Sequence, residues 1–106
     1  MRELNARELA QRLAEPAGQP HLLDVRESWE LAICRLDGAE HVPMREIPAA
    51  LDRLDRERET VVICHHGVRS YAVVRFLEQN GFANVVNLRG GIDGWARDVD
   101  PAMAKY

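Results

Sequence analysis

The chain has 106 residues, of which 46% are hydrophobic and 29% are charged, so we expect residues 1–106 to form a single ordinary globular domain. A net charge of -3 gives no reason to expect a nucleic-acid partner, and no apolar run approaches the roughly 20 residues of a membrane span. The charged N-terminus has no signal-peptide core, and two cysteines are too few for a disulfide framework, so the expected compartment is the cytoplasm.

The first third of the chain predicts a helix, a buried strand and a second short helix. Residues 1–16 are charged and have a helical pattern, in which Asn5 and Glu8 form a capping-box start. Residues 21–25, HLLDV, are a short apolar run between turn signals and are expected to form a buried strand. Ser28 is expected to cap the short helix that follows.

The remaining two thirds continue this alternation of strands and helices. Residues 37–44 predict a turn and a brief strand, after which Pro48 suits the first turn of a helix. Residues 60–64, TVVIC, are apolar without interruption, as a central strand of a parallel sheet would be. The next helix ends at residues 80–81, residues 84–88 form another strand, and a last short helix follows. We expect the longer of these helices to turn four side chains inward: Ala72, Val73, Phe76 and Leu77. This alternation predicts an α/β fold with a central parallel β-sheet and helices on both faces.

The segment CHHGVRS, residues 64–70, joins the strongest strand to the following helix. Ligands of parallel α/β sheets bind beyond the carboxyl ends of the strands, which is where Cys64 lies. Gly67 gives the backbone the freedom to turn sharply, and the amide N–H groups of such a turn can form a nest for an anion. That nest would stabilise a thiolate, the nucleophilic form of cysteine. On residue type alone, a cysteine at the end of a strand is more often a small packed side chain.

The same segment resembles the active-site loop of rhodanese-type sulfurtransferases, Cys-x-x-Gly-x-Arg-Ser. Three further segments are similar to that family, in the family's order and spacing: LLDVRESWE, ICRLDGAEHVP and VVNLRGGIDGW. The resemblance extends from about residue 3 to residue 97. It implies a single domain with the rhodanese-like fold, in which Cys64 carries the sulfur.

The chemistry implied by the resemblance is sulfur transfer in two steps. The Cys64 thiolate takes the sulfane sulfur of a small donor such as thiosulfate and becomes a persulfide. A thiophilic acceptor, which can be cyanide, a thiol or a protein, then removes that sulfur. We expect no cofactor, no membrane contact, and a monomer or weak homodimer. No metal is expected either, because Cys64, His65 and His66 are adjacent in a tight loop and cannot easily converge on one ion.

Two alternatives remain within the same resemblance. Related phosphatases and arsenate reductases place the arginine six residues after the cysteine, whereas Arg69 is five residues after Cys64. The shorter loop fits a persulfide sulfur better than a tetrahedral oxyanion, which favours sulfur transfer. The other alternative is a non-catalytic rhodanese module that binds proteins. Such modules typically lose the cysteine, and this chain keeps it.

The resemblance also assigns roles to the residues of the loop and its surroundings. The substrate-binding and persulfide-cradle residues are expected to be His65, His66, Gly67, Val68, Arg69 and Ser70. The two histidines either contact the donor anion or are simply exposed. Arg69 is expected to brace the loop through a carboxylate such as Asp24 or Glu27, with Arg26 sharing in this support.

Four further positions bear on the expected site. Gly90 and Gly91 are interpreted as turn glycines beside the mouth of the site, and Arg89 could add a positive charge there. Cys34 is either an inert thiol or a resolving partner for Cys64, which would require Cα atoms within roughly 7 Å of each other.

Overall fold

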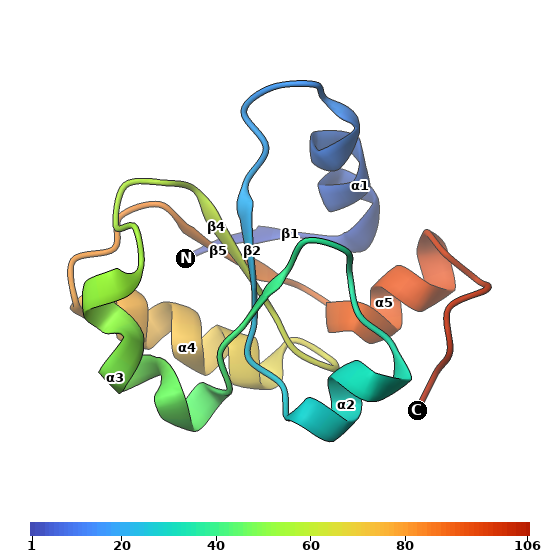
Figure 1. The fold of residues 1–106 in the computed structure, drawn as a ribbon. Helices are drawn as coiled ribbons and strands as arrows, with labels where there is room; N and C mark the ends of the chain where they lie inside the picture. The colour runs from blue at the N-terminus through green and yellow to red at the C-terminus, as the bar shows by residue number, and fades with distance from the viewer.

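The structure is a computed structural model that describes every residue from Met1 to Tyr106. Its centre is one sheet of five parallel strands in the order β1-β5-β4-β2-β3 (Figure 1). The strands are β1 Arg2–Leu4, β2 His21–Asp24, β3 Glu40–His41, β4 Thr60–Ile63 and β5 Val85–Leu88. The helices are α1 Ala6–Ala14, α2 Ser28–Ile33, α3 Ile47–Ala50, α4 Val68–Gln79 and α5 Gly91–Asp98. Short 3-10 turns, Met44–Glu46 and Leu51–Arg53, flank α3. The predicted parallel α/β sheet is confirmed.

Strand β4 occupies the centre of the sheet. Its Val61 lies opposite Leu22 of β2 on one side and Val86 of β5 on the other. Val61, Val62 and Ile63 have no exposed surface. The uninterrupted apolar run follows from this position, because a strand covered on both faces has no solvent side for a polar residue.

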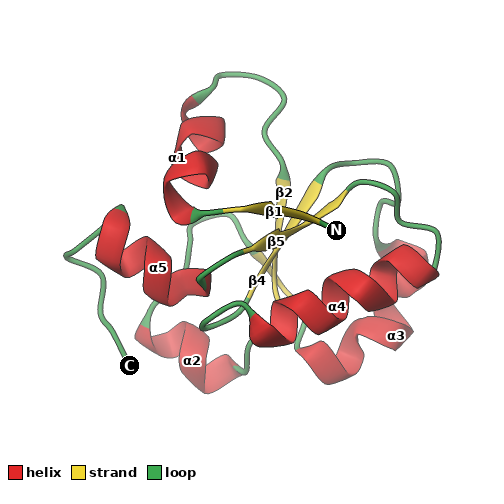
Figure 2. Cartoon of the chain, turned by 180° about the vertical axis from the view of Figure 1, so that it is seen from behind, coloured by secondary structure: helices red, strands yellow, loops and turns green.

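Helices cover both faces of the sheet, as predicted. Successive side chains of a strand point to opposite faces, so Val62 and Cys64 belong to one core cluster while Val61 and Ile63 belong to the other. Helices α3 and α4 cover the first face, and α1 and α5 cover the second (Figure 2). Since all strands are parallel, the loop after β4 and the starts of α2 and α5 meet at one edge, beyond the carboxyl ends of the strands.

Strand β1 was not predicted, since residues 1–16 were expected to lead directly into a helix. The capping box at Asn5 is present, but Arg2–Leu4 precede it as a strand that pairs with β5. Three residues are too few for an apolar alternation to show in the sequence. The strand exists because β5 offers a free edge for pairing, a property of the folded sheet and not of the segment itself.

Two details of the helices differ from expectation. The N-cap of α2 is Glu27 and not Ser28, and the Glu30 carboxylate accepts a 2.9 Å hydrogen bond from the Glu27 N–H. In α4, Ala72 is exposed and Val74 is buried in its place, because the stripe facing the sheet is shifted by part of a turn. None of the helices combines the length and apolar character that crossing a membrane would require.

Candidate active site

Cys64 follows the last residue of β4 and is only 1% exposed. Its sulfur accepts a hydrogen bond from the Gly67 N–H, with N···S of 3.1 Å, and lies 3.3 Å from the Ser70 hydroxyl. Gly67 is the N-cap of α4 and has a φ of +100°, a left-handed conformation that favours glycine. The loop therefore closes tightly around the sulfur, as the sequence predicted for this position.

The first turn of α4 supplies further amide donors. The N–H groups of Val68, Arg69 and Ser70 have no acceptor within the protein, while the N–H of Tyr71 bonds to the Gly67 carbonyl. Unpaired amides at a helix start carry partial positive charge and favour an anion. Together with the Gly67 amide, this helix start favours a negative charge on or near Cys64.

Asn87 connects Ser70 to the loop and was not singled out in the sequence. It lies in β5, is 2% exposed, and accepts a short hydrogen bond from the Ser70 hydroxyl. Its amide donates to the Gly67 carbonyl at 3.3 Å and to Glu3 at 2.9 Å. The Ser70 hydroxyl thus lies between the Asn87 side-chain oxygen and the Cys64 sulfur. The only sign of Asn87 in the sequence was that a polar residue stood within an otherwise apolar strand.

Arg69 braces the loop, but through a different carboxylate from the two expected. Both terminal nitrogens of its guanidinium donate to Glu30 at 2.8 Å. Asp24 instead pairs with Arg26, and Glu27 pairs with the exposed Arg45. Glu30 is one helical turn beyond Glu27 and is 3% exposed, so it offers Arg69 a buried partner. The expected pairing of Arg69 with Asp24 or Glu27 is wrong.

Asp24 and Arg26 support this ion pair indirectly. They form a fully buried pair, 2.7 Å between Nη2 and Oδ2. Arg26 also donates to the Tyr106 hydroxyl at 3.1 Å, and that hydroxyl donates to Glu30 at 2.7 Å. The network thus runs from Asp24 to Arg69 through four consecutive contacts, and it explains how a pair at the carboxyl end of β2 can stabilise a loop beyond β4.

Glu30→Gln is expected to lower the free energy of unfolding at neutral pH, and to do so less as the pH falls. Arg69 lowers the pKa of Glu30 from 4.5 to about 2. A carboxyl with a depressed folded pKa stabilises the fold fully above its unfolded value, and the contribution disappears as pH falls from about 4.5 toward 2. Urea unfolding of both proteins from pH 7 downward measures the difference.

The matched control for this prediction is Glu27→Gln. Glu27 pairs with Arg45, but its side chain is 43% exposed, and breaking exposed pairs costs less than about 1 kcal/mol. A loss in Glu30→Gln that stays constant between pH 7 and pH 3 would contradict the assigned ion pair.

His65 and His66 form an aromatic stack with Tyr106. The Tyr106 ring lies 3.8 Å from the His65 ring at an interplanar angle of 10°, and His66 stacks on His65 at 3.9 Å. Burial and then the neighbouring His66 lower the pKa of His65, which favours its neutral form. Tyr106 had no signal in the sequence, because it belongs to none of the recognised segments.

Gly91 lets α5 approach the loop closely. The Ile92 N–H donates to the Cys64 carbonyl at 2.9 Å, and the Asp93 N–H donates to the His65 carbonyl at 3.0 Å. A Cβ atom on Gly91 would lie 2.3 Å from the His65 carbonyl oxygen. Both this contact and the φ of +59° require a glycine at position 91. Gly91 is therefore a turn residue, as interpreted from the sequence, and also the point where α5 contacts the loop.

Two hollows flank the loop. The first, of about 240 Å³, contains Arg89 as expected and is lined by Glu3, His66, Gly67, Val68, Tyr71, Asn87, Arg89 and Gly90. The second, of about 490 Å³, lies on the side of Arg69 and is lined by Val25, Glu27, Met44, Arg45, Pro48 and Arg69. Cys64 lines neither hollow, in agreement with its burial.

Cys34 is half-buried, and both thiols are free.

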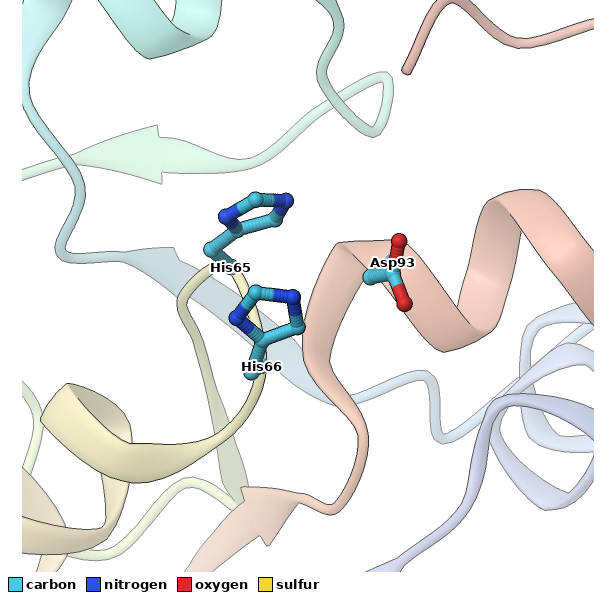
Figure 3. Close-up of side chains that lie close together, drawn as sticks. All are labelled: His65, His66 and Asp93. Carbon is cyan, nitrogen blue, oxygen red and sulfur yellow. The ribbon is translucent and has the colours of Figure 1, made fainter. Parts of the chain in front are cut away.

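A second chemical grouping lies beside the loop. His65, His66 and Asp93 place one possible metal-ligating atom each within 4.8 Å of the others (Figure 3). Asp93 is 27 residues farther along the chain than His66 and was not among the candidate ligands that the sequence offered, which were Cys64 and the two histidines.

Comparisons with known proteins agree with this fold. The model of the rhodanese-like domain family matches residues 5–98, which leaves Tyr106 outside the match. A protein of Allochromatium vinosum named sulfurtransferase is 37% identical over 102 residues, covering 96% of this chain and 94% of that protein. Thiosulfate sulfurtransferase GlpE of Actinobacillus pleuropneumoniae is 35% identical over 85 residues, covering 80% of this chain and 79% of that enzyme. The crystal structure of a rhodanese-like domain protein from Staphylococcus aureus has a TM-score of 0.86 and 31% identity, and the match covers 100% of this chain and 99% of that one.

Proposed function

The chain belongs to the rhodanese-like domain family, and from that premise we propose that it transfers sulfane sulfur from thiosulfate to a thiophilic acceptor through a persulfide on Cys64. Relatives named as sulfurtransferases support this activity at the level of the family. The observation that carries the proposal is the hydrogen bond from the Gly67 N–H to the Cys64 sulfur, made at the start of α4. It provides an anionic sulfur with a donor that is already in position.

The first step loads the cysteine. The Cys64 thiolate attacks the outer sulfur of thiosulfate and forms a new S–S bond, while the bond between the two thiosulfate sulfurs breaks and sulfite leaves with its electron pair. The product is a Cys64 persulfide, whose outer sulfur carries the negative charge. The Gly67 amide and the free amides at the start of α4 stabilise this charge.

The second step removes the outer sulfur from the Cys64 persulfide. The acceptor attacks the outer sulfur and the persulfide bond breaks, so that the electron pair returns to Cys64 as thiolate. Cyanide becomes thiocyanate, and a small-molecule or protein thiolate becomes a persulfide. Sulfur oxidation states balance without an external oxidant or a cofactor.

Ser70 and Arg69 have separate roles in this scheme. The Ser70 hydroxyl lies 3.3 Å from the sulfur and can turn its proton from Asn87 toward the anionic sulfur of the thiolate. Arg69 is held by Glu30. This ion pair stabilises one side of the loop, and Arg69 forms no covalent bond to the substrate. The loop remains six residues long from Cys64 to Arg69, the length that favours sulfur over a tetrahedral oxyanion.

Lengthening the loop by one glycine between Val68 and Arg69 is expected to reduce sulfur transfer by about a hundredfold, since small misplacements of reacting groups have effects of this size. The insertion moves Arg69 away from Glu30 and widens the cradle. The wider loop is also expected to admit phosphate-like or arsenate-like oxyanions. Initial rates with thiosulfate and cyanide measure the first effect.

The control is a glycine inserted after Asp37, in an exposed turn, which is expected to leave the rate within about twofold because exposed turns tolerate insertions. In parallel, the native chain is expected to hydrolyse aryl phosphates no faster than its Cys64→Ser variant. A Cys64-dependent phosphatase rate in the native chain would favour the phosphatase alternative over the proposed activity.

A further inference from the structure

His65, His66 and Asp93 form a group of side chains that are all common metal ligands. Their ligand atoms lie within 4.8 Å of one another, although the residues come from two elements, the loop after β4 and the first turn of α5 (Figure 3). We propose that these three side chains bind a divalent transition-metal ion such as Zn²⁺. The site is distinct from the Cys64 sulfur and does not depend on the proposed sulfur transfer.

The backbone holds the two halves of this site together. The Asp93 N–H donates to the His65 carbonyl at 3.0 Å, and the Ile92 N–H donates to the Cys64 carbonyl at 2.9 Å. Gly91 allows this approach because it has no Cβ to meet the loop. The backbone of Asp93 is therefore fixed next to the loop before any ion arrives, which lowers the entropic cost of assembling the ligands.

The ligand side chains are also available. His21 and His41 are engaged elsewhere, with Glu40 and with the Arg26 carbonyl, whereas the His66 ring makes no hydrogen bond. In Figure 3 the rings of His65 and His66 lie one above the other on the loop, and Asp93 stands beside them on helix α5.

One guanidinium group competes with a metal ion for the carboxylate of Asp93. The nearest cation to the Asp93 carboxylate is Arg97, whose Nη1 lies 3.6 Å from Oδ2. That pair is exposed and weak, so it leaves the other carboxylate oxygen for an ion.

The ligand types select the class of metal. Two imidazoles and one carboxylate suit Zn²⁺, Co²⁺ and Ni²⁺, while Mg²⁺ and Ca²⁺ prefer oxygen ligands alone. Tetrahedral zinc ligands lie about 3.4 Å from one another, as follows from bond lengths of about 2.1 Å, so the observed group must close by roughly 1 Å. His65 is held by Tyr106, so the exposed His66 must tilt out of its stack on His65 to direct a ring nitrogen at the same ion.

This site also explains why the sequence did not indicate a metal. The sequence offered Cys64, His65 and His66 as one set within a tight loop, and that set of three cannot easily converge on one ion. The third ligand comes from Asp93 instead, and it approaches from outside the loop through the turn at Gly90 and Gly91.

Zinc titration of the reduced chain tests the proposal. Isothermal calorimetry with ZnSO₄ is expected to show one ion per chain, and the ring resonances of His65 and His66 are expected to shift in NMR spectra while those of His21 do not. Asp93→Asn is expected to weaken zinc binding by about tenfold or more. The matched control is Asp98→Asn, because Asp93 and Asp98 are 34% and 35% exposed and both pair with Arg97. This control is expected to bind zinc like the native chain.

Two further variants make the outcome decisive. His66→Gln is expected to lose zinc affinity as Asp93→Asn does, and Cys64→Ser is expected to keep it. Equal affinity in Asp93→Asn and Asp98→Asn would overturn the proposal. So would loss of binding in Cys64→Ser alone, since the ion would then belong to the thiol. Co²⁺, which gives visible absorption bands in a tetrahedral site, provides an independent readout for the same set of variants.

Discussion

Cys64→Ser is expected to reduce the rate of sulfur transfer from thiosulfate to cyanide by about a thousandfold or more, because removing a covalent nucleophile has effects of at least this size. The serine hydroxyl cannot carry a sulfane sulfur, and no other thiol receives a hydrogen bond from the start of α4. Cys34→Ser is expected to keep most of the activity, because Cys34 only ends α2 and its carbonyl, not its sulfur, contacts Arg26.

The measurement combines rates with mass spectrometry. After exposure to thiosulfate, the native chain and Cys34→Ser are expected to gain one sulfur atom, located on Cys64 by peptide mapping, and Cys64→Ser none. Circular dichroism shows whether each variant is folded. Comparable loss of activity in both folded variants would indicate a two-cysteine redox mechanism in place of a single sulfur carrier.

The strand, loop and helix that hold Cys64 could be predicted because their signals are local. An apolar β-branched run, a glycine that permits a left-handed turn, and a helical pattern follow one another within residues 60–79. Parallel packing then brings the carboxyl ends of the strands to one edge by topology alone. This is why the position of the cysteine and its Gly67 donor needed no knowledge of distant residues.

The partners of the loop could not be predicted, because they depend on how separate elements pack. The sequence predicted a carboxylate partner for Arg69 and named Asp24 and Glu27, whereas the partner is Glu30, one helical turn beyond Glu27. Arg69 and Glu30 are 39 residues apart, and Tyr106 and Glu30 are 76 apart. Asp93 likewise reaches the histidines only because α5 packs against the loop.

Gly91→Ala is expected to damage both the fold and the loop. Its Cβ would lie 2.3 Å from the His65 carbonyl oxygen and 2.5 Å from the Cys64 carbonyl oxygen, so either α5 or the loop must move. The positive φ alone costs about 1–2 kcal/mol for a residue with a Cβ, and forcing atoms into a packed site adds roughly 1–3 kcal/mol. Movement of α5 would also break the hydrogen bonds from Ile92 and Asp93 to the loop carbonyls.

Gly38→Ala separates the two costs. Gly38 has a φ of +80°, but a Cβ there meets nothing within 4 Å, so this variant carries the backbone strain without the clash. Urea unfolding is expected to place Gly38→Ala slightly below the native chain in stability and Gly91→Ala well below both. In the absence of urea, where each variant is folded, only Gly91→Ala is expected to lose sulfur-transfer activity. The clash falls on the carbonyl oxygens of Cys64 and His65, which belong to the loop that holds the nucleophile. If the two variants unfold at the same urea concentration and transfer sulfur equally well, the loop does not approach α5 as closely as described, and the support for Cys64 must come from α4 alone.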